Sequence, residues 1–219
     1  MTTQGKKWGN LWGNLNWKEV TPADIDACIA RGADVDMVEK KTFPLGYDHK
    51  NPLIEAMRAN NPVAFSHLIQ RGADLNFRLP YANLYPEGAR YGNHSVITDA
   101  PSMLYVKYAT QKGMRILPEH LLDIESHKGG ETEKKLSFIL DFFEKRKNSK
   151  ECLSVLRILP RLRDTQFLVE RFSTFLDYLD KKDVLAIPEN IRTDRVLKKR
   201  VLQAMGNKKR RPNTQRIKD

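Results

Sequence analysis

The sequence predicts an all-α solenoid of helix-turn-helix units, and two observations support this fold class. Residues 25–36, I-D-A-C-I-A-R-G-A-D-V-D, recur as residues 65–76, F-S-H-L-I-Q-R-G-A-D-L-N, so the chain contains an internal repeat whose glycines are 40 residues apart. Between the copies, Asn51-Pro52 is a helix-start signal, because Asn caps helix N-termini and Pro is tolerated at the first helical position. One unit therefore has a first helix that begins at Pro52 and a second helix that ends before Gly72.

The turn after each second helix can be assigned residue by residue. Gly32 and Gly72 are expected to end these helices in the left-handed conformation, which residues with a Cβ resist. Asp74 is expected to accept a hydrogen bond from nearby backbone, and Leu75 to return to the core. The two G-A-D turns thus predict the same structure twice.

These turns resemble those of the ankyrin repeat, and together with the R-A-N-N-P spacer they are similar to bacterial members of that family. The family motif T-P-L-H-x-A has a His where this chain has Ile54, so we expect apolar packing in place of the hydrogen bonds of that His. The family period is about 33 residues, and we place the extra residues of the 40-residue spacing in a finger loop at 37–50. The specific resemblance covers roughly residues 20–80, and it implies an ankyrin-repeat solenoid.

Further repeats are expected on both sides, because such units cannot bury their apolar faces alone. Residues 12–20 occupy the first-helix position of the first repeat, and Thr21-Pro22 begins its second helix. Downstream, helices at 102–110 and 133–145 predict a degenerate third repeat with a long insertion. The tandem Trp8 and Trp12 are expected to cap the first repeat's core, with a ligand motif as the alternative.

The predicted organisation has three parts. Residues 1–146 form ankyrin-like repeats with finger-loop insertions, residues 147–206 form a C-terminal helical cap, and residues 207–219 form a disordered basic tail. Cys28 and Cys152 lie on apolar helix faces, so buried thiols are expected rather than a disulfide. No segment has the length of a membrane span or the character of a signal peptide, which predicts a cytoplasmic protein.

The positive charge is concentrated near the C-terminus. Of the formal net charge of +11, residues 195–219 carry +9, from ten Lys or Arg and one Asp. The cluster Lys208, Lys209, Arg210 and Arg211 is compatible with a nuclear-localisation signal, a nucleic-acid contact, an anionic-surface contact, a bacterial secretion signal or a solvated tail.

The two insertions, 37–50 and 77–96, leave the repeat at equivalent positions and are expected to build one aromatic and basic surface. Tyr and Arg dominate binding hot spots, although these aromatics can instead pack on their own loops. The predicted partner-binding residues are Phe43, Tyr47, Phe77, Arg78, Tyr81, Tyr85, Arg90 and Tyr91.

No catalytic, metal or cofactor site is predicted. The five histidines are scattered without partner cysteines, and no phosphate-binding glycine loop, nucleophile elbow or H-E-x-x-H motif occurs. We therefore expect a protein-protein interaction module without enzymatic activity, an adaptor or an effector delivered into a host cell. The alternative is a nucleic-acid-associated protein that uses the basic tail, and an enzyme is the third hypothesis.

Overall fold

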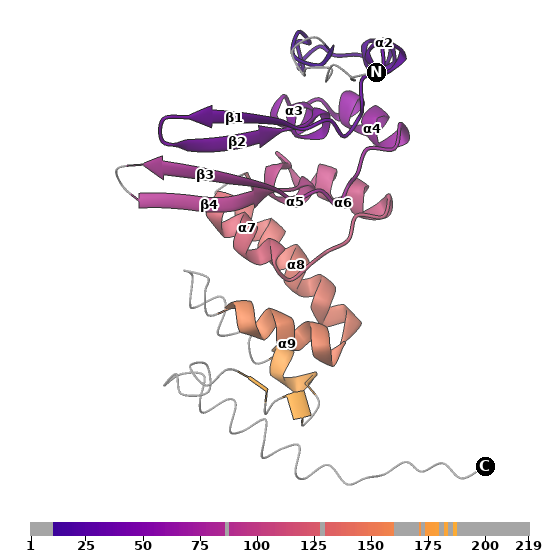
Figure 1. The fold of residues 1–219 in the computed structure, drawn as a ribbon. Coiled ribbons are helices and arrows are strands. Elements are labelled where there is room, and N and C mark those ends of the chain that lie inside the picture. Colours follow the sequence, from indigo (N-terminus) through magenta and orange to yellow (C-terminus); the bar gives the residue numbers. More distant parts are fainter. Residues whose placement is uncertain are drawn as a thin grey trace, which may run out of the picture. The chain divides into compact units, whose positions relative to one another are not determined.

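The computed structural model describes residues 11–85, 88–127, 130–159, 171, 174–179, 182–183 and 186–187 of the 219-residue chain (Figure 1). The chain divides into two compact units. The first comprises Met1–Ile116 and Asp123–Lys135, and the second comprises Leu117–Leu122 and Leu136–Asp219. The predicted domain boundaries after residues 146 and 206 stay predictions.

The predicted all-α fold class is wrong, because the first unit contains a four-stranded antiparallel sheet in the order β1-β2-β3-β4. The strands are β1 (Glu39–Phe43), β2 (Gly46–Lys50), β3 (Leu79–Tyr85) and β4 (Gly88–His94). Each expected finger loop is a β-hairpin, so the fold is mixed α/β. The first hairpin gives only a weak sequence signal, Thr42, Phe43 and Tyr47 around Pro44-Leu45, because the rest of E-K-K-T-F and G-Y-D-H-K is polar or Gly.

Helices accompany the hairpins in the order of the chain. The first unit contains α2 (Pro22–Ala30), α3 (Pro52–Arg58), α4 (Pro62–Gln70), α5 (Val96–Asp99) and α6 (Met103–Gln111). The helices α7 (His120–His127) and α8 (Thr132–Arg146) have residues in both units, and α9 (Ser149–Ile158) belongs to the second.

The predicted helix starts are confirmed by their caps. Thr21 and Asp24 form a reciprocal capping box at α2, and the side chain of Asn51 accepts a hydrogen bond from the Ile54 N–H at α3. Both helices have Pro at their first position, where the missing N–H leaves no hydrogen bond unmade. Local side-chain chemistry therefore sets where these helices begin.

The predicted helix ends at Gly32 and Gly72 are confirmed, and the structure contains a third helix end of the same kind at Gly113. Gly32, Gly72 and Gly113 have φ of 86°, 92° and 101° and follow α2, α4 and α6. After Gly113, the Met114 N–H donates to the Ala109 carbonyl at 2.9 Å, as the Ala73 N–H donates to the Leu68 carbonyl at 3.0 Å. The third turn is therefore equivalent to the first two.

This third turn corrects the predicted third repeat. The pair α5 and α6 occupies the position that α3 and α4 hold one unit earlier, whereas the prediction paired 102–110 with 133–145. The four-residue helix α5 (Val96–Asp99) is too short to give a periodic pattern, so the sequence did not reveal it. Residues 12–20 also differ from the expected helix, since they form turns.

Carboxylate and amide side chains connect successive turns. The Asp74 N–H donates to Asp36 Oδ1 and the Arg115 N–H donates to Asn76 Oδ1, both at 2.8 Å. Asp74 Oδ1 also accepts from the Asn76 N–H within its own turn, as predicted. Each turn thus offers an acceptor that satisfies a backbone donor of the next.

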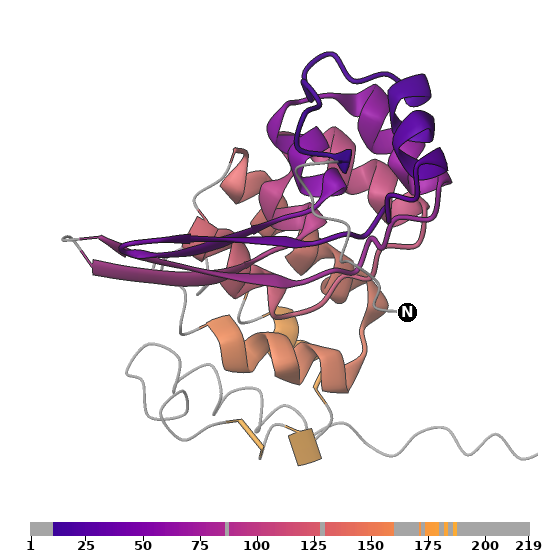
Figure 2. The ribbon, with the colours of Figure 1, turned by 45° about the horizontal axis from the view of Figure 1, so that its top comes forward.

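The two hairpins join through β2 and β3, which pair at Gly46↔Asn83 and Tyr47↔Ala82. Figure 1 shows both hairpins extending in the same direction beyond α3 and α5, and Figure 2 shows them running alongside each other. Strand pairing therefore joins the two insertions into one sheet, whereas the predicted single aromatic and basic surface is divided between its two faces.

The apolar core of the first unit is formed by buried side chains of its helices and of residues 11–20. Trp12 and Ile54 are fully buried, and Trp12 packs near Trp17 with ring centroids 6.0 Å apart. Trp12 is thus part of the core, as predicted, whereas its tandem partner Trp8 lies outside the described residues. Cys28 and Cys152 are both buried free thiols, which confirms the cysteine prediction.

The second unit has its own buried residues in α8, α9 and the residues that follow. Its core includes Phe143, Cys152, Leu156 and Phe175. Burial raises the pKa of the Cys152 thiol to about 11, so this thiol stays protonated at neutral pH. In the part of the chain that the structure describes, none of the helices is long and apolar enough to cross a membrane.

Candidate functional site

The strand register separates the predicted partner-binding residues onto two faces of the sheet. Directly opposed residues in antiparallel strands point to the same face, and Tyr47 pairs with Ala82, which in turn pairs with Tyr91. Tyr47 and Tyr91 therefore flank Ala82 in one cross-strand row. We call the face that carries this row the tyrosine face, and its other members include Lys40, Thr42, His49 and Pro80.

On the tyrosine face, neighbouring side chains hold the Tyr47 ring in place, whereas the Tyr91 side chain is largely exposed. The Lys40 ammonium lies 4.4 Å from the centre of the Tyr47 ring, and His49 packs against that ring edge-on. His49 Nδ1 lies 2.5 Å from the Pro80 carbonyl oxygen, which ties the first hairpin to the second. Tyr91 is 63% exposed.

The remaining predicted residues lie elsewhere. Phe43 is exposed but points to the opposite face, since it pairs with Gly46 beside the Tyr47 row. Phe77 is buried, and Arg78 forms a 2.6 Å ion pair with Asp123. The side chains of Tyr85 and Arg90, and the whole basic tail from Lys208 to Arg211, lie outside the described residues.

Tyr81 is buried rather than exposed, which corrects its predicted role as a surface residue. Its ring centroid lies 4.8 Å from that of His94 and 5.7 Å from that of His127. Its cross-strand partner is Gly92, where an added Cβ would come within 2.7 Å of the Tyr81 hydroxyl oxygen. Tyr81 therefore packs over Gly92 and covers a polar network on this second face of the sheet.

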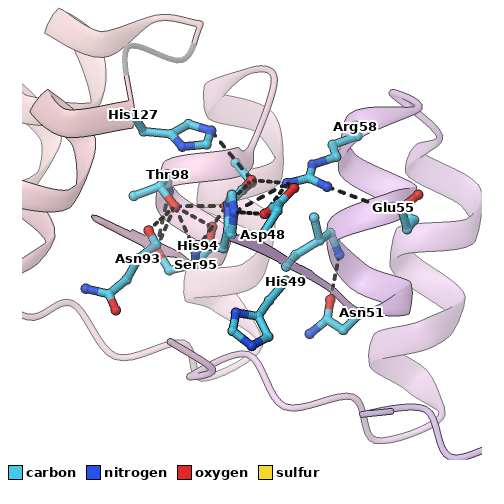
Figure 3. A network of polar contacts seen from close by, with 12 residues as sticks. Asp48, His49, Asn51, Glu55, Arg58, Asn93, His94, Ser95, Thr98 and His127 are labelled. Carbon is cyan, nitrogen blue, oxygen red and sulfur yellow. Dashed lines mark hydrogen bonds and ion pairs between the residues drawn. The ribbon is translucent and has the colours of Figure 1, made fainter. Parts of the chain in front are cut away.

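The polar network brings together five side chains from five elements (Figure 3). Asp48 comes from β2, His94 from the end of β4, Asp99 from the end of α5, Arg58 from α3 and His127 from the end of α7. All five belong to the first unit. The network thus lies where both hairpins meet the helices.

His94 is held between two carboxylates. Its Nδ1 lies 2.9 Å from Asp99 Oδ1, and its Nε2 lies 2.5 Å from Asp48 Oδ1. Because both partners are acceptors, each ring nitrogen donates a proton and the imidazole is a cation. Arg58 Nη2 adds a second positive charge, 3.2 Å from Asp48 Oδ2 and 4.0 Å from Asp99 Oδ1.

Burial and charge oppose each other at His94. The ring is 4% exposed, and this burial alone would lower its pKa, but the hydrogen bonds and charges of Asp48 and Asp99 raise the pKa to about 9. Burial alone would raise the pKa of both carboxyl groups, yet their bonds to His94 hold both values below normal. The three groups are therefore ionised together at neutral pH.

His127 differs from His94 in its protonation. Burial lowers its pKa, and nearby cations on His94, Arg58 and Lys135 act in the same direction against the opposing charge of Asp99. Its Nε2 lies 3.5 Å from Asp99 Oδ1. At neutral pH His127 is therefore a neutral imidazole beside the carboxylate that also binds His94.

Comparisons with known protein families, curated proteins and solved structures gave no match for this chain. The site is therefore interpreted from its own geometry.

Two histidines and one carboxylate in this network have the composition of a metal-ligand set. The ligand atoms of His94, Asp99 and His127 all lie within 4.8 Å of one another. None of the histidines was predicted to be a ligand, because they are scattered along the chain without partner cysteines at metal-ligand spacing. The available signal was H-S-V-I-T-D, in which the Ser95–Thr98 capping box turns Asp99 back toward His94.

A separate open pocket of about 820 Å³ lies along α4 and α6. Its lining includes Pro62, Phe65, Leu104, Tyr105 and Tyr108. It contains none of the network residues, so the network and this pocket are two different places on the first unit.

Proposed function

We propose that this protein is a protein-binding module that contacts its partner through the tyrosine face of the sheet. The observation that carries the proposal is the row in which Tyr47 and exposed Tyr91 flank Ala82. Tyrosines supply a large contact area at small cost in conformational entropy, and they are enriched in binding hot spots. Ala82 between them is buried, so the tyrosine rings rather than Ala82 provide the contact area.

Two further features support a binding role. Lys40 and His49 hold the Tyr47 ring in place before any partner arrives, which lowers the entropy lost on binding. The resemblance of the glycine turns to ankyrin repeats points the same way, because repeat units of this kind present extended binding surfaces. An adaptor, or an effector delivered into a host cell, is the role we propose for such a module.

The proposal is tested by replacing both tyrosines with alanine. We expect the Tyr47→Ala, Tyr91→Ala double variant to keep its circular dichroism spectrum and nearly its melting temperature, because Tyr91 is largely exposed. Affinity capture from cell lysate followed by mass spectrometry should identify a partner for the wild type, and the double variant should lose it.

Phe43→Ala is the matched control for this experiment. Phe43 is an exposed aromatic residue of the same hairpin on the opposite face, so its removal should leave capture unchanged. If Phe43→Ala loses partner capture as fully as the double variant does, the assignment of binding to the tyrosine face is contradicted. If both variants still capture the partner, the assignment is overturned.

A further inference from the structure

We propose that His94, Asp99 and His127 bind one divalent transition-metal ion of the Zn²⁺ class, with Asp48 orienting His94 from behind. The proposed ligands are His94 Nδ1, His127 Nε2 and Asp99 Oδ1. This site is distinct from the tyrosine face, since it lies on the other face of the sheet.

The spacing of these atoms is close to that of a coordinated metal. Zn²⁺ binds His nitrogen and carboxylate oxygen at about 2.0 to 2.2 Å, so tetrahedral ligands lie about 3.3 Å from one another. Asp99 Oδ1 lies 2.9 Å from His94 Nδ1 and 3.5 Å from His127 Nε2. The two nitrogens lie within 4.8 Å of each other, so a modest rotation of the partly exposed His127 ring completes the geometry.

The groups behind the ligands already orient them. Asp48 Oδ1 accepts from His94 Nε2, which is the carboxylate–histidine arrangement that fixes a ligating ring and makes it a stronger ligand. The other oxygen of Asp99, Oδ2, accepts from the Ser95 N–H at 3.1 Å and from the Thr98 hydroxyl at 3.0 Å. His94 Nδ1 lies 2.9 Å from Asp99 Oδ1 and 3.1 Å from Oδ2, so Oδ1 is the oxygen nearer to His94 and the one that faces His127 at 3.5 Å.

Metal binding replaces a proton. His94 donates its Nδ1 proton to Asp99 in the present structure, and the metal takes the position of that proton, which is released to solvent. Three protein ligands leave a fourth position for water. Two nitrogens and one oxygen suit Zn²⁺, Co²⁺ and Ni²⁺ better than Mg²⁺ or Ca²⁺, which prefer oxygen ligands alone.

Two neighbouring cations, Arg58 and Lys135, repel a bound metal ion and so weaken its binding. Arg58 is bound to Asp48 and Glu55, and Lys135 donates to the Thr98 carbonyl oxygen at 3.0 Å. The Arg58 guanidinium, 4.0 Å from Asp99 Oδ1, is the main electrostatic cost of the site.

The test is titration of the full chain, stripped with a chelator, with Zn²⁺ by calorimetry and with Co²⁺ by visible absorption. We expect one ion per chain and d–d bands of low-symmetry Co²⁺ coordination. His127→Ala and His127→Phe should each weaken binding at least tenfold, and the second variant keeps an aromatic ring against Tyr81 and His94. Asp48→Asn should weaken binding 10- to 100-fold, as is usual for groups that orient metal ligands.

His67→Ala is the matched control. His67 Nε2 also lies 2.7 Å from a carboxylate oxygen, on Asp26, but Asp26's other close partner is Arg71 rather than a second histidine. This variant should bind the metal as the wild type does. Absence of stoichiometric binding by the wild type, or binding that both His127 variants retain, would overturn the proposal.

Discussion

At the scale of single residues, Gly72 has the left-handed backbone conformation that ends a helix of the repeat. Its φ is 92°, and a Cβ added there would meet no atom within 4 Å. The cost of a substitution is therefore backbone strain alone, without a steric clash. We expect Gly72→Val to lower the free energy of unfolding by about 1 to 3 kcal/mol.

Gly72→Asn separates this strain from other effects, because Asn tolerates positive φ better than Val does. Urea denaturation of the three proteins should place Asn between Gly and Val. Identical midpoints for Gly72 and Gly72→Val would show that this turn is not the helix end described above.

The His94 cation makes stability depend on pH. Its pKa rises from 6.5 to about 9 on folding, so its stabilising contribution is complete below pH 6.5 and disappears as the pH rises through 9. In chelator, we expect His94→Gln to cost about 1 to 3 kcal/mol more at pH 6 than at pH 10.

The comparison of two proteins removes the contribution of titrating groups whose pKa does not depend on His94. The depressed pKa of Lys135 acts in the opposite direction, stabilising the fold as the pH rises above 8, but it does so in both proteins and cancels. Chemical denaturation at the two pH values measures the difference. A cost of His94→Gln that stays constant from pH 6 to 10 would contradict the charged state assigned to His94.

At the scale of elements, the turns are coupled by the side chains of Asp36 and Asn76. Each accepts a backbone hydrogen bond from the turn of the following unit at 2.8 Å. We expect Asp36→Ala and Asn76→Ala each to lower the free energy of unfolding by about 1 kcal/mol, the usual net value of such a bond.

The two effects should add, because the substitutions act on different bonds. Thermal or urea denaturation of the single and double variants measures them. Glu119→Ala, at an exposed position, is the control and should change stability by less than about 0.5 kcal/mol. Substitutions at Asp36 and Asn76 that change stability no more than this control would show that the turns are coupled by apolar packing alone.

Helices and strands differed in how well the sequence predicted them. The starts of α2 and α3 and the ends of α2 and α4 depend on caps, Pro and Gly within a few residues, and all were predicted. The strands lie where the sequence predicts finger loops, because β1 is polar and mostly exposed and lacks an alternating apolar pattern. Its strand conformation depends on pairing with β2, which is itself paired with β3.

At the scale of the whole molecule, the distribution of charge is the dominant sequence feature. Residues 195–219 carry +9 of the net +11, so the alternative function as a nucleic-acid-associated protein rests on this segment. We expect weak, salt-sensitive binding to duplex DNA that disappears when residues 207–219 are deleted, because each phosphate contact releases about 0.9 counterion.

Fluorescence anisotropy at several salt concentrations measures this binding in the full chain and the deletion. Partner capture through Tyr47 and Tyr91 should be unaffected by the deletion. DNA binding that is tight at physiological salt and survives the deletion would favour the nucleic-acid hypothesis, with a footprint elsewhere in the chain.

Local sequence was sufficient to specify the repeat, its glycine turns, its capped helix starts and its buried cysteines, because each depends on interactions within a few residues or on one apolar face. The candidate sites depend on long-range packing instead. Pairing of β2 with β3 placed Tyr47 and Tyr91 in one row and turned Tyr81 inward over Gly92. The same packing brought His94, Asp99 and His127 together from β4, α5 and α7. The capping box at Ser95 brings Asp99 to His94 locally, but the approach of Asp48, Arg58 and His127 depends on the positions of whole elements, which no local pattern encodes.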